Sequence, residues 1–387
     1  MLRSGAWAAA AAALFLGWQS LHVHYNRSGN WSGLFLIGKD FAMPADLIRG
    51  TYRFPSGYDG EMYRVLAHDP FLKRGYARYM DSPRERSERM LVPALAYLLA
   101  GGNQPYIDAA YIAVVALFAF LGAFWLSRWA ALAGAHPAFG MAFLLVPATL
   151  ISMDRMTVDI ALAAFTVAFA LYFKQRAQWK LFLVLALACL TRETGFLLVA
   201  GACLFDLVAR HVRHALLWAA AALPALAWYA FVYRSLAEPA HFGLPIWFAH
   251  RFGLGVFSAV FRPPHYPLAP PLEWIARAGD VLALTGVVLS VTLAIAAAVK
   301  TRLSNPLACS ALMFAVLVFF LTTPVYWTDV NGFGRFVSPL LILVAIQSAT
   351  VRWRYARWWV GLLPLALIDL RLGMQFVSQI TGVLSSL

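Results

Sequence analysis

The run YIDAAYIAVVALFAFLGAFWLS, at residues 106–127, decides the fold class of this chain. It is nearly free of charge and long enough to cross a hydrocarbon core, which needs about 20 mainly apolar residues. Comparable runs lie at residues 5–23, 138–153, 157–173, 179–191, 195–209, 214–234, 280–299, 306–323, 335–350 and 357–372. The sequence therefore predicts an all-α polytopic membrane protein with about eleven transmembrane helices.

The composition fits this fold class. Of 387 residues, 61% are hydrophobic and 13% are charged, whereas about 25% are charged in soluble domains. The net charge of +13 does not indicate nucleic-acid binding, because the basic residues lie in short segments between apolar runs, a pattern typical of membrane topology. Cys189, Cys203 and Cys309 all lie inside apolar runs and predict neither a disulfide framework nor a metal site.

The alternation of basic and acidic connections predicts the topology. Every second connection is basic and is expected in the cytoplasm by the positive-inside rule. These connections hold Arg128, Arg176, Arg213, Arg302 and Arg354, among others. Of eighteen acidic residues, only Asp206 lies near this side. Residues 180–209 fit the alternation as two short helices, with residues 191–195 forming an outer turn between them.

The same pattern divides the chain into five parts. Residues 1–24 form a first transmembrane helix, which we expect to stay uncleaved because no clean signal-peptidase site follows the apolar run. Residues 25–105 form a long extracytoplasmic loop, in which the short apolar segment 90–101 predicts a surface helix. Residues 106–234 form a transmembrane core, residues 235–279 a second extracytoplasmic loop, and residues 280–387 the C-terminal transmembrane helices.

One polar stretch in the first loop, SGYDGEMYR at residues 56–64, is a candidate functional site. It brings two carboxylates, two phenols and an arginine together between glycines. Glycines permit close backbone approach, so a Tyr-Asp-Gly turn can direct the carboxylate of Asp59 at a substrate. The alternative interpretation is a structural Asp-Gly turn that connects two surface helices.

Three further polar groups lie on the predicted outer side. They are Asp154, Arg155 and Asp159; Arg192 and Glu193; and Asp329 with Arg335. Charges beside membrane spans are costly and indicate function by default, although each pair could also be a local ion pair at a helix end. Guanidinium groups match phosphate oxygens, and a carboxylate can take a proton from an attacking hydroxyl. The groups therefore suit chemistry on a lipid-linked phosphate.

These motifs resemble the GT-C superfamily of integral-membrane glycosyltransferases, which includes protein O-mannosyltransferases and aminoarabinose transferases. Residues 58–60 (YDG) resemble the first-loop motif, and residues 88–93 (ERMLVP) resemble the start of a surface helix in bacterial members. Residues 153–159 (MDRMTVD) resemble the second outer loop, and residues 190–195 (LTRETG) a later turn. The resemblance covers residues 1–235. Many members carry paired acids in the first loop, whereas this chain has a glycine between Asp59 and Glu61.

The resemblance implies transfer of a sugar from a polyprenyl-phosphate donor to a glycan, lipid or protein acceptor. Asp59 would act as general base and Glu61 would be the second catalytic carboxylate. Contacts to the donor phosphate or the substrate would come from Tyr58, Arg64, Arg89, Asp154, Arg155, Asp159, Arg192, Glu193 and Arg335. Participation of a divalent metal is left open. The expected location is a bacterial inner membrane, with the site facing the periplasm or exterior.

Two other functions stay open on the sequence. A transporter or flippase of a lipid-linked or anionic solute would be favoured by broken helices in two related halves, and the sequence shows no such repeat. A non-catalytic assembly protein would be favoured if the outer polar groups lay far apart. A shared site instead requires Asp59 to face both residues 154–159 and Arg192.

The predicted topology can be tested by single-cysteine labelling in a background without the three native cysteines. Cysteines at Asp59 and Glu193 should react with an impermeant reagent from outside, and a cysteine at Arg302 should react only after permeabilisation. The reason is the distribution of basic connections. Labelling of position 302 from outside would overturn the topology.

Overall fold

The computed structural model describes residues 2–236, 255, 256, 259, 266, 269–321, 325–350 and 358–385. Most of these residues are helical, and a two-residue parallel strand pair places Ile37 and Gly38 beside Arg53 and Phe54. The predicted all-α class is confirmed. Most of the predicted loop at residues 235–279, and the basic residue Arg354, lie outside the described residues.

The chain forms two compact units. The first comprises residues 1–196, 221–239 and 379–387, and the second comprises residues 197–220 and 240–378. The helices of the first unit are α1 (Leu2–Asn26), α6 (Ile107–Leu132), η4 (Pro137–Leu145), α7 (Pro147–Arg155), α8 (Asp159–Gln175), α9 (Gln178–Thr191), η5 (Glu193–Gly195) and α12 (Leu223–Ser235), together with those of the first loop.

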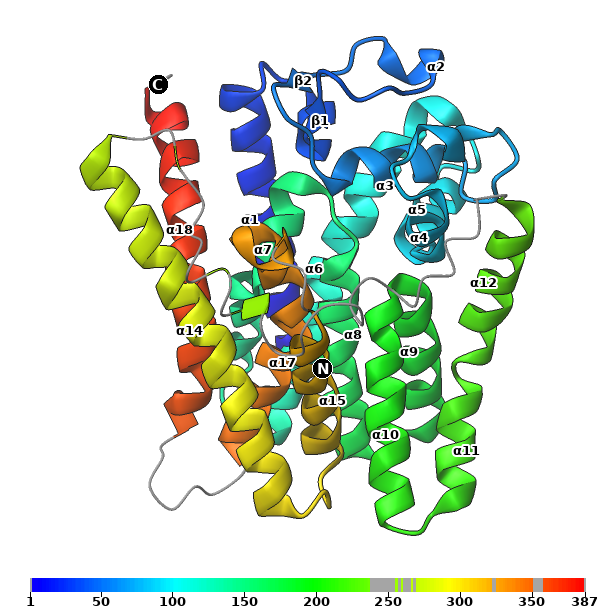
Figure 1. The fold of residues 1–387 in the computed structure, drawn as a ribbon, viewed down its shortest axis with the longest axis vertical. Helices are drawn as coiled ribbons and strands as arrows, with labels where there is room; N and C mark the ends of the chain where they lie inside the picture. Colours follow the sequence, from blue (N-terminus) through cyan, green and yellow to red (C-terminus); the bar gives the residue numbers. More distant parts are fainter. Residues whose placement is uncertain are drawn as a thin grey trace. The chain divides into compact units, whose positions relative to one another are not determined.

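The core of the first unit is built around α6, which contacts α1, α8 and η4 (Figure 1). Small residues let these helices approach closely. Gly122 on α6 faces the ring of Phe143, and Gly140 on η4 faces Ser127, with no room for a side chain at either glycine. The apolar helix α8 is buried along most of its length. Close packing of this kind suits helices whose surroundings are apolar.

The predicted first loop folds into short elements between α1 and α6. They are η1 (Trp31–Phe35), β1 (Ile37–Gly38), α2 (Ala45–Ile48), β2 (Arg53–Phe54), α3 (Asp59–His68), η2 (Tyr76–Tyr79), α4 (Pro83–Glu88), α5 (Leu91–Leu99) and η3 (Gln104–Tyr106). In Figure 1 these elements gather in the upper part of the view, beside the C-terminal part of α1. The helix predicted within residues 90–101 is confirmed as α5.

A buried ionic network fastens α3 to the start of α6. The Arg64 guanidinium bonds the Asp108 carboxylate, with Nη2 2.8 Å and Nε 2.9 Å from Oδ2. His68 Nε2 lies 3.1 Å from Oδ1 of the same carboxylate. Because a buried charge is tolerated only with good partners, this network fixes the orientation of α3.

The first turn of α3 packs directly on backbone. The α-carbon of Gly60 faces the carbonyl oxygens of Phe35 and Arg155, and a Cβ there would collide with both. The expected close backbone approach at the Tyr-Asp-Gly motif is therefore present. It brings residue 59 beside the end of α7, which carries the second predicted polar group.

The second unit contains the remaining helices. They are α10 (Phe196–Val208, from Leu197 onward), α11 (Val212–Ala220), α14 (Pro270–Thr301), α15 (Pro306–Phe320), α16 (Val325–Thr328), α17 (Val330–Thr350), η7 (Trp358–Leu362) and most of α18 (Leu363–Leu384). Arg371 on α18 bonds Asp280 on α14 at 2.7 Å. Asp280 also accepts a 2.7 Å hydrogen bond from Tyr266. Gly201 on α10 packs on Ser310 of α15.

Among the described residues, five helices are long and apolar enough to cross a membrane. They are Gln104–Leu132, Val212–Ser235, Pro270–Thr301, Val330–Ala349 and Trp359–Leu384. A sixth span results if η4 and α7, which bend by 59°, are counted as one. The expected eleven spans are not confirmed. The helices α8, α9, α10 and α15 have 17, 14, 13 and 15 residues, short of the usual 20 or so. The predicted first span, α1, is long enough at 25 residues but is not among the helices that are apolar enough.

Adding a methyl group at Gly60 should destabilise the protein. Gly60→Ala forces the start of α3 away from two carbonyl groups, and overpacking of this kind costs about 1–3 kcal/mol. The matched control is Gly17→Ala, where α1 has nothing within 4 Å of the new methyl and alanine favours the helix. Thermal unfolding in detergent should show a lower midpoint for Gly60→Ala and no decrease for Gly17→Ala. Equal midpoints would contradict the packing argument.

Candidate functional site

The carboxylate of Asp59 lies at the N-terminus of α3. Tyr58 precedes the helix in an extended conformation, so α3 begins at Asp59. A negative charge is favourable in the first turn of a helix because of the helix dipole. Arg86 Nη2 lies 3.1 Å from Asp59 Oδ1, and the Asp59 side chain is 20% exposed. Asp59 is therefore an ionic partner that keeps access to solvent.

Arg86 is shared between two carboxylates. Its Nε and Nη2 also donate to the two oxygens of Asp81, both at 2.9 Å. Burial by itself would lower the pKa of Arg86, but Asp81 and Asp59 raise it above its usual value. Arg86 thus stays charged and positions Asp59 beside the more exposed Asp81.

Two further arginines are bound to Glu193. Arg89 Nε and Nη2 donate to the Glu193 carboxylate at 2.9 and 3.0 Å, and Arg89 Nη1 donates to the Tyr63 hydroxyl at 3.1 Å. Arg192 donates to Glu193 at 3.2 Å and is also paired with Asp159 at the start of α8. These bonds join α3, the residue after α4, the turn after α9 and the first residue of α8.

We call this set the arginine–carboxylate cluster, and its members are Asp59, Tyr63, Asp81, Arg86, Arg89, Asp159, Arg192 and Glu193. The Arg86 guanidinium lies 5.9 Å from the centre of the Tyr63 ring, and the Tyr63 hydroxyl accepts from Arg89. Tyr63 therefore connects the half around Asp59 with the half around Glu193. Three polar groups that are far apart in the sequence meet here.

Neighbouring opposite charges inside the cluster shift the pKa values of Glu193 and Arg89 toward their charged forms. Burial would raise the pKa of Glu193, but Arg89 and Arg192 lower it to about 2. The neighbouring Glu88 behaves oppositely: burial, with repulsion from Glu193, raises its pKa to about 7. The pKa of Arg89, which burial would lower, is raised well above its usual value by Glu193 and Tyr63.

The other two residues of the group that contains Asp159 lie next to the cluster. The Arg155 guanidinium is 4.7 Å from the centre of the Tyr58 ring, and its Nε is 3.7 Å from Asp154 Oδ1. Asp154 also accepts a 2.7 Å hydrogen bond from Gln379. Since the Arg155 carbonyl packs on Gly60, residues 154 and 155 lie beside the start of α3.

Two predicted residues are buried and are bonded to groups outside the cluster. Glu61 is 8% exposed, accepts a 2.8 Å hydrogen bond from the Gly38 N–H, and leaves no room for a side chain at Gly57. Arg64 is bound to Asp108 as described above. Residues two apart on a helix do not share a face, which explains why Glu61 does not accompany Asp59. The catalytic assignment of Glu61 stays a prediction.

The last predicted residue, Arg335, belongs to the second unit. It lies on α17, is 8% exposed, and donates from Nε to the Asn331 carbonyl at 3.0 Å. Its participation in a site with Asp59 stays a prediction.

The predicted site residues did not include Tyr63, Asp81, Arg86 and Glu88, which contact or adjoin the cluster. For one of these residues, Arg86, the spacing in the sequence offers a signal. Arg86 and Arg89 are three residues apart near the end of a short helix, and such residues lie on neighbouring positions of a helix surface. An arginine three residues before a predicted phosphate ligand was therefore a reasonable candidate.

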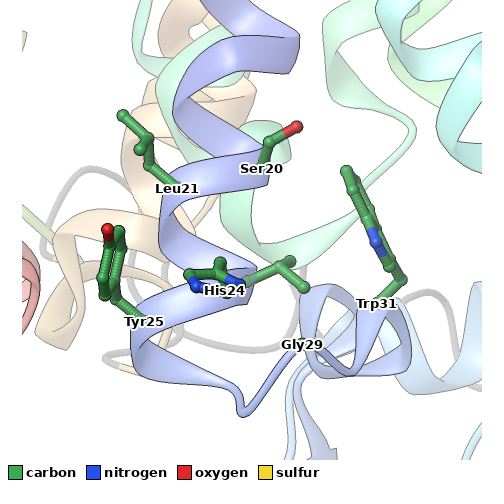
Figure 2. A pocket seen from close by; sticks show the side chains of 7 residues that line it. Ser20, Leu21, His24, Tyr25, Gly29 and Trp31 are labelled. Atoms are coloured by element: carbon green, nitrogen blue, oxygen red, sulfur yellow. The ribbon is translucent and has the colours of Figure 1, made fainter.

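A group of possible metal ligands and a cavity occur in the described part of the chain, and Asp59 belongs to neither. Among the described residues, the group with suitable metal ligands is Asp206, His211 and His214 in the second unit. A cavity of about 490 Å³ lies near the end of α1 in the first unit (Figure 2). Its lining residues are Ser20, Leu21, Val23, His24, Tyr25, Gly29 and Trp31, none of which belongs to the cluster.

Comparisons with protein-family models, with curated proteins and with solved structures found no match to this chain. The resemblance to the GT-C superfamily therefore stays an expectation that rests on the sequence motifs.

Neutralising Glu88 should change the pH dependence of stability in a defined direction. Its pKa rises from 4.5 to about 7 on folding, so the folded state loses stability as pH increases through this window. Glu88→Gln should therefore be more stable than the wild type at pH 8, by on the order of 1–2 kcal/mol after allowance for solvent screening. The two proteins should converge at about pH 4.5.

Thermal midpoints of purified protein between pH 4.5 and 8 provide the measurement. Glu85→Gln is the control, because Glu85 bonds Arg89 from the same helix, so its loss should not stabilise the protein at any pH. A difference between Glu88→Gln and wild type that grows toward acid would contradict the assignment.

Proposed function

We propose that this protein is a membrane glycosyltransferase that moves a sugar from a polyprenyl-phosphate donor to an acceptor hydroxyl, with Asp59 as general base. The proposal includes a bacterial inner membrane and a site on its periplasmic side. One observation carries it: the partly exposed carboxylate of Asp59 is held by Arg86 at the edge of a cluster that gathers several guanidinium groups. This is the combination of groups that transfer from a phosphate ester requires.

The proposed reaction uses each part of this arrangement. Asp59 takes the proton of the acceptor hydroxyl, and the hydroxyl oxygen forms a bond to the anomeric carbon of the sugar. The bond between that carbon and the phosphate oxygen breaks, and polyprenyl phosphate leaves with the electron pair. Nearby guanidinium groups stabilise the negative charge that develops on the leaving phosphate.

Arg155 is our candidate for the first contact with the phosphate. Its side chain is 17% exposed, whereas Arg89 is 4% exposed and bound on both sides by Glu193 and Tyr63. Arg155 also adjoins Tyr58, the residue before Asp59. In this proposal Arg89 and Arg192 support the shape of the site, while Arg155 and Asp59 contact the substrates.

Asp59→Asn should reduce sugar transfer by about 10²–10⁴-fold, the usual contribution of a general base. The amide keeps the size of the side chain, and Arg86 keeps its two hydrogen bonds to Asp81, so the protein should fold and insert. Transfer would be measured with purified protein and a panel of radiolabelled polyprenyl-phosphate sugars. If a panel sugar is transferred by the wild type and equally well by Asp59→Asn, the catalytic assignment fails.

Asp81→Asn is the matched control. Asp81 binds the same Arg86 but is more exposed, at 49%. If Asp59 acts merely by neutralising Arg86, the two variants should lose activity equally. If Asp59 is the base, Asp81→Asn should lose less than about tenfold.

A transporter of a lipid-linked or anionic solute is the second candidate, favoured by one feature. The helices η4 and α7 together meet the length and apolarity of one span but bend by 59°, and discontinuous helices often line transport sites. Proteoliposomes separate the two functions. Movement of a fluorescent polyprenyl-phosphate sugar between leaflets without transfer would support transport, and transfer without movement would support the enzyme.

A further inference from the structure

Three potential metal ligands gather at the turn between α10 and α11 in the second unit. Asp206 lies near the end of α10, His211 precedes α11, and His214 lies in its first turn. One ligand atom of each residue falls within 4.8 Å of the other two. His211 Nδ1 and His214 Nδ1 lie 3.5 and 3.9 Å from the same oxygen, Asp206 Oδ1.

Local backbone structure produces this arrangement. The His211 N–H donates to the Asp206 carbonyl at 2.7 Å, which closes the turn. The N–H groups of His214 and Ala215 donate to the His211 carbonyl at 3.0 and 3.1 Å and start α11. Two histidines three residues apart at a helix start lie on the same side, and the turn aims this side at Asp206.

The carboxylate is oriented by a second residue. Trp218 Nε1 donates to Asp206 Oδ2 at 2.6 Å. The Asp206 side chain is 5% exposed, whereas those of His211 and His214 are 62% and 49% exposed. One carboxylate oxygen is thus held by the indole, and the other faces two accessible imidazoles. Metal-binding carboxylates are commonly oriented by such hydrogen bonds.

We propose that Asp206, His211 and His214 bind one divalent transition-metal ion of the zinc class. Two imidazoles and one carboxylate suit Zn²⁺, Co²⁺ or Ni²⁺, whereas Ca²⁺ and Mg²⁺ require mainly oxygen ligands. In a tetrahedral zinc site the three ligand atoms are roughly 3.3 Å apart, so small rotations of the exposed imidazoles bring them into place. The fourth position is left to water.

The surroundings weaken the competing interpretation of an ordinary ion pair. An ordinary surface ion pair joins two exposed groups and contributes little stability, whereas the Asp206 carboxylate is 5% exposed and is bonded by the Trp218 indole. Arg210 and Arg213 flank the histidines and are exposed. Their positive charge opposes binding of any cation. An ion therefore has to bind imidazole strongly to occupy this site. Cys203 is already engaged, since its thiol donates to the Ala215 carbonyl at 3.2 Å.

The bound ion would join the end of α10 to the start of α11. A ligand that binds the folded state raises the unfolding temperature. Zn²⁺ should therefore raise the thermal midpoint of the wild type, and the rise should disappear when either histidine is replaced. This stability readout does not depend on the proposed glycosyltransferase activity.

The test uses the full-length protein in detergent with a histidine-free affinity tag. Zn²⁺ is titrated by calorimetry, and Co²⁺ is titrated by its visible absorption, which is intense for a tetrahedral site. The wild type should bind one ion per chain. His211→Ala and His214→Ala should each weaken binding by at least the roughly 10–100-fold that loss of a neighbouring orienting group costs, and Trp218→Phe by about that factor.

His136→Ala is the matched control. It removes another exposed histidine, one that accepts a hydrogen bond from Ala138 in the first unit, and it should bind like the wild type. Because His211 and His214 are exposed, their replacement should leave the fold intact, as monodisperse elution will show. Equal binding by the wild type and the His211→Ala/His214→Ala double variant, or no saturable binding by the wild type, would overturn the proposal.

Discussion

Burial of two guanidinium groups constrains the first unit more than any other interaction. Arg89 and Arg192 are almost inaccessible to water, at 4% and 9% exposure, and removing a charge from water costs several kcal/mol. Glu193 lies between them and bonds both. Without that carboxylate, two buried like charges would face each other. The positions of α3, α8 and the turn after α9 therefore follow from satisfying these charges.

The apolar runs predicted where helices form, because a helix in a membrane satisfies its own backbone hydrogen bonds. The run at residues 106–127 became α6, and the interruption predicted at residues 191–195 became the turn between α9 and α10. The bend between η4 and α7 was not predicted. Pro147 starts α7, but a proline in an apolar run does not reveal the angle that tertiary packing selects.

Some members of the candidate site were predictable from the sequence, but the bonds between them were not. Asp59, Asp159 and Glu193 were recognised because charges are rare in such a chain. The direction of Glu61 depends on α3 beginning at Asp59, a boundary that the sequence does not specify to one residue. Arg86 belongs to the same polar loop as Asp59, but the sequence does not single it out as the partner of Asp59, since many arginines occur in that loop and pairing is decided by the fold.

Most charged residues of this chain support its architecture. Arg64 with Asp108, and Arg371 with Asp280, form internal pairs with the same chemistry as the cluster around Asp59. Exposure of the carboxylate does not separate the two cases, because the side chains of Asp59 and Glu193 are 20% and 32% exposed and that of Asp108 is 29% exposed. The number of guanidinium groups does separate them. Arg86, Arg89 and Arg192 lie in one network, whereas Asp108 is paired with one arginine and one histidine.

Sharing of Arg86 between Asp59 and Asp81 has a consequence for motion. If the Asp59 side chain rotates away, Arg86 keeps both of its hydrogen bonds to Asp81. The Arg86 guanidinium is therefore not left without a carboxylate partner. The rotation therefore costs less free energy than one that leaves a guanidinium without a partner. Asp81 acts as a second partner for Arg86, and in the proposed reaction this would allow Asp59 to release the arginine when the acceptor hydroxyl arrives.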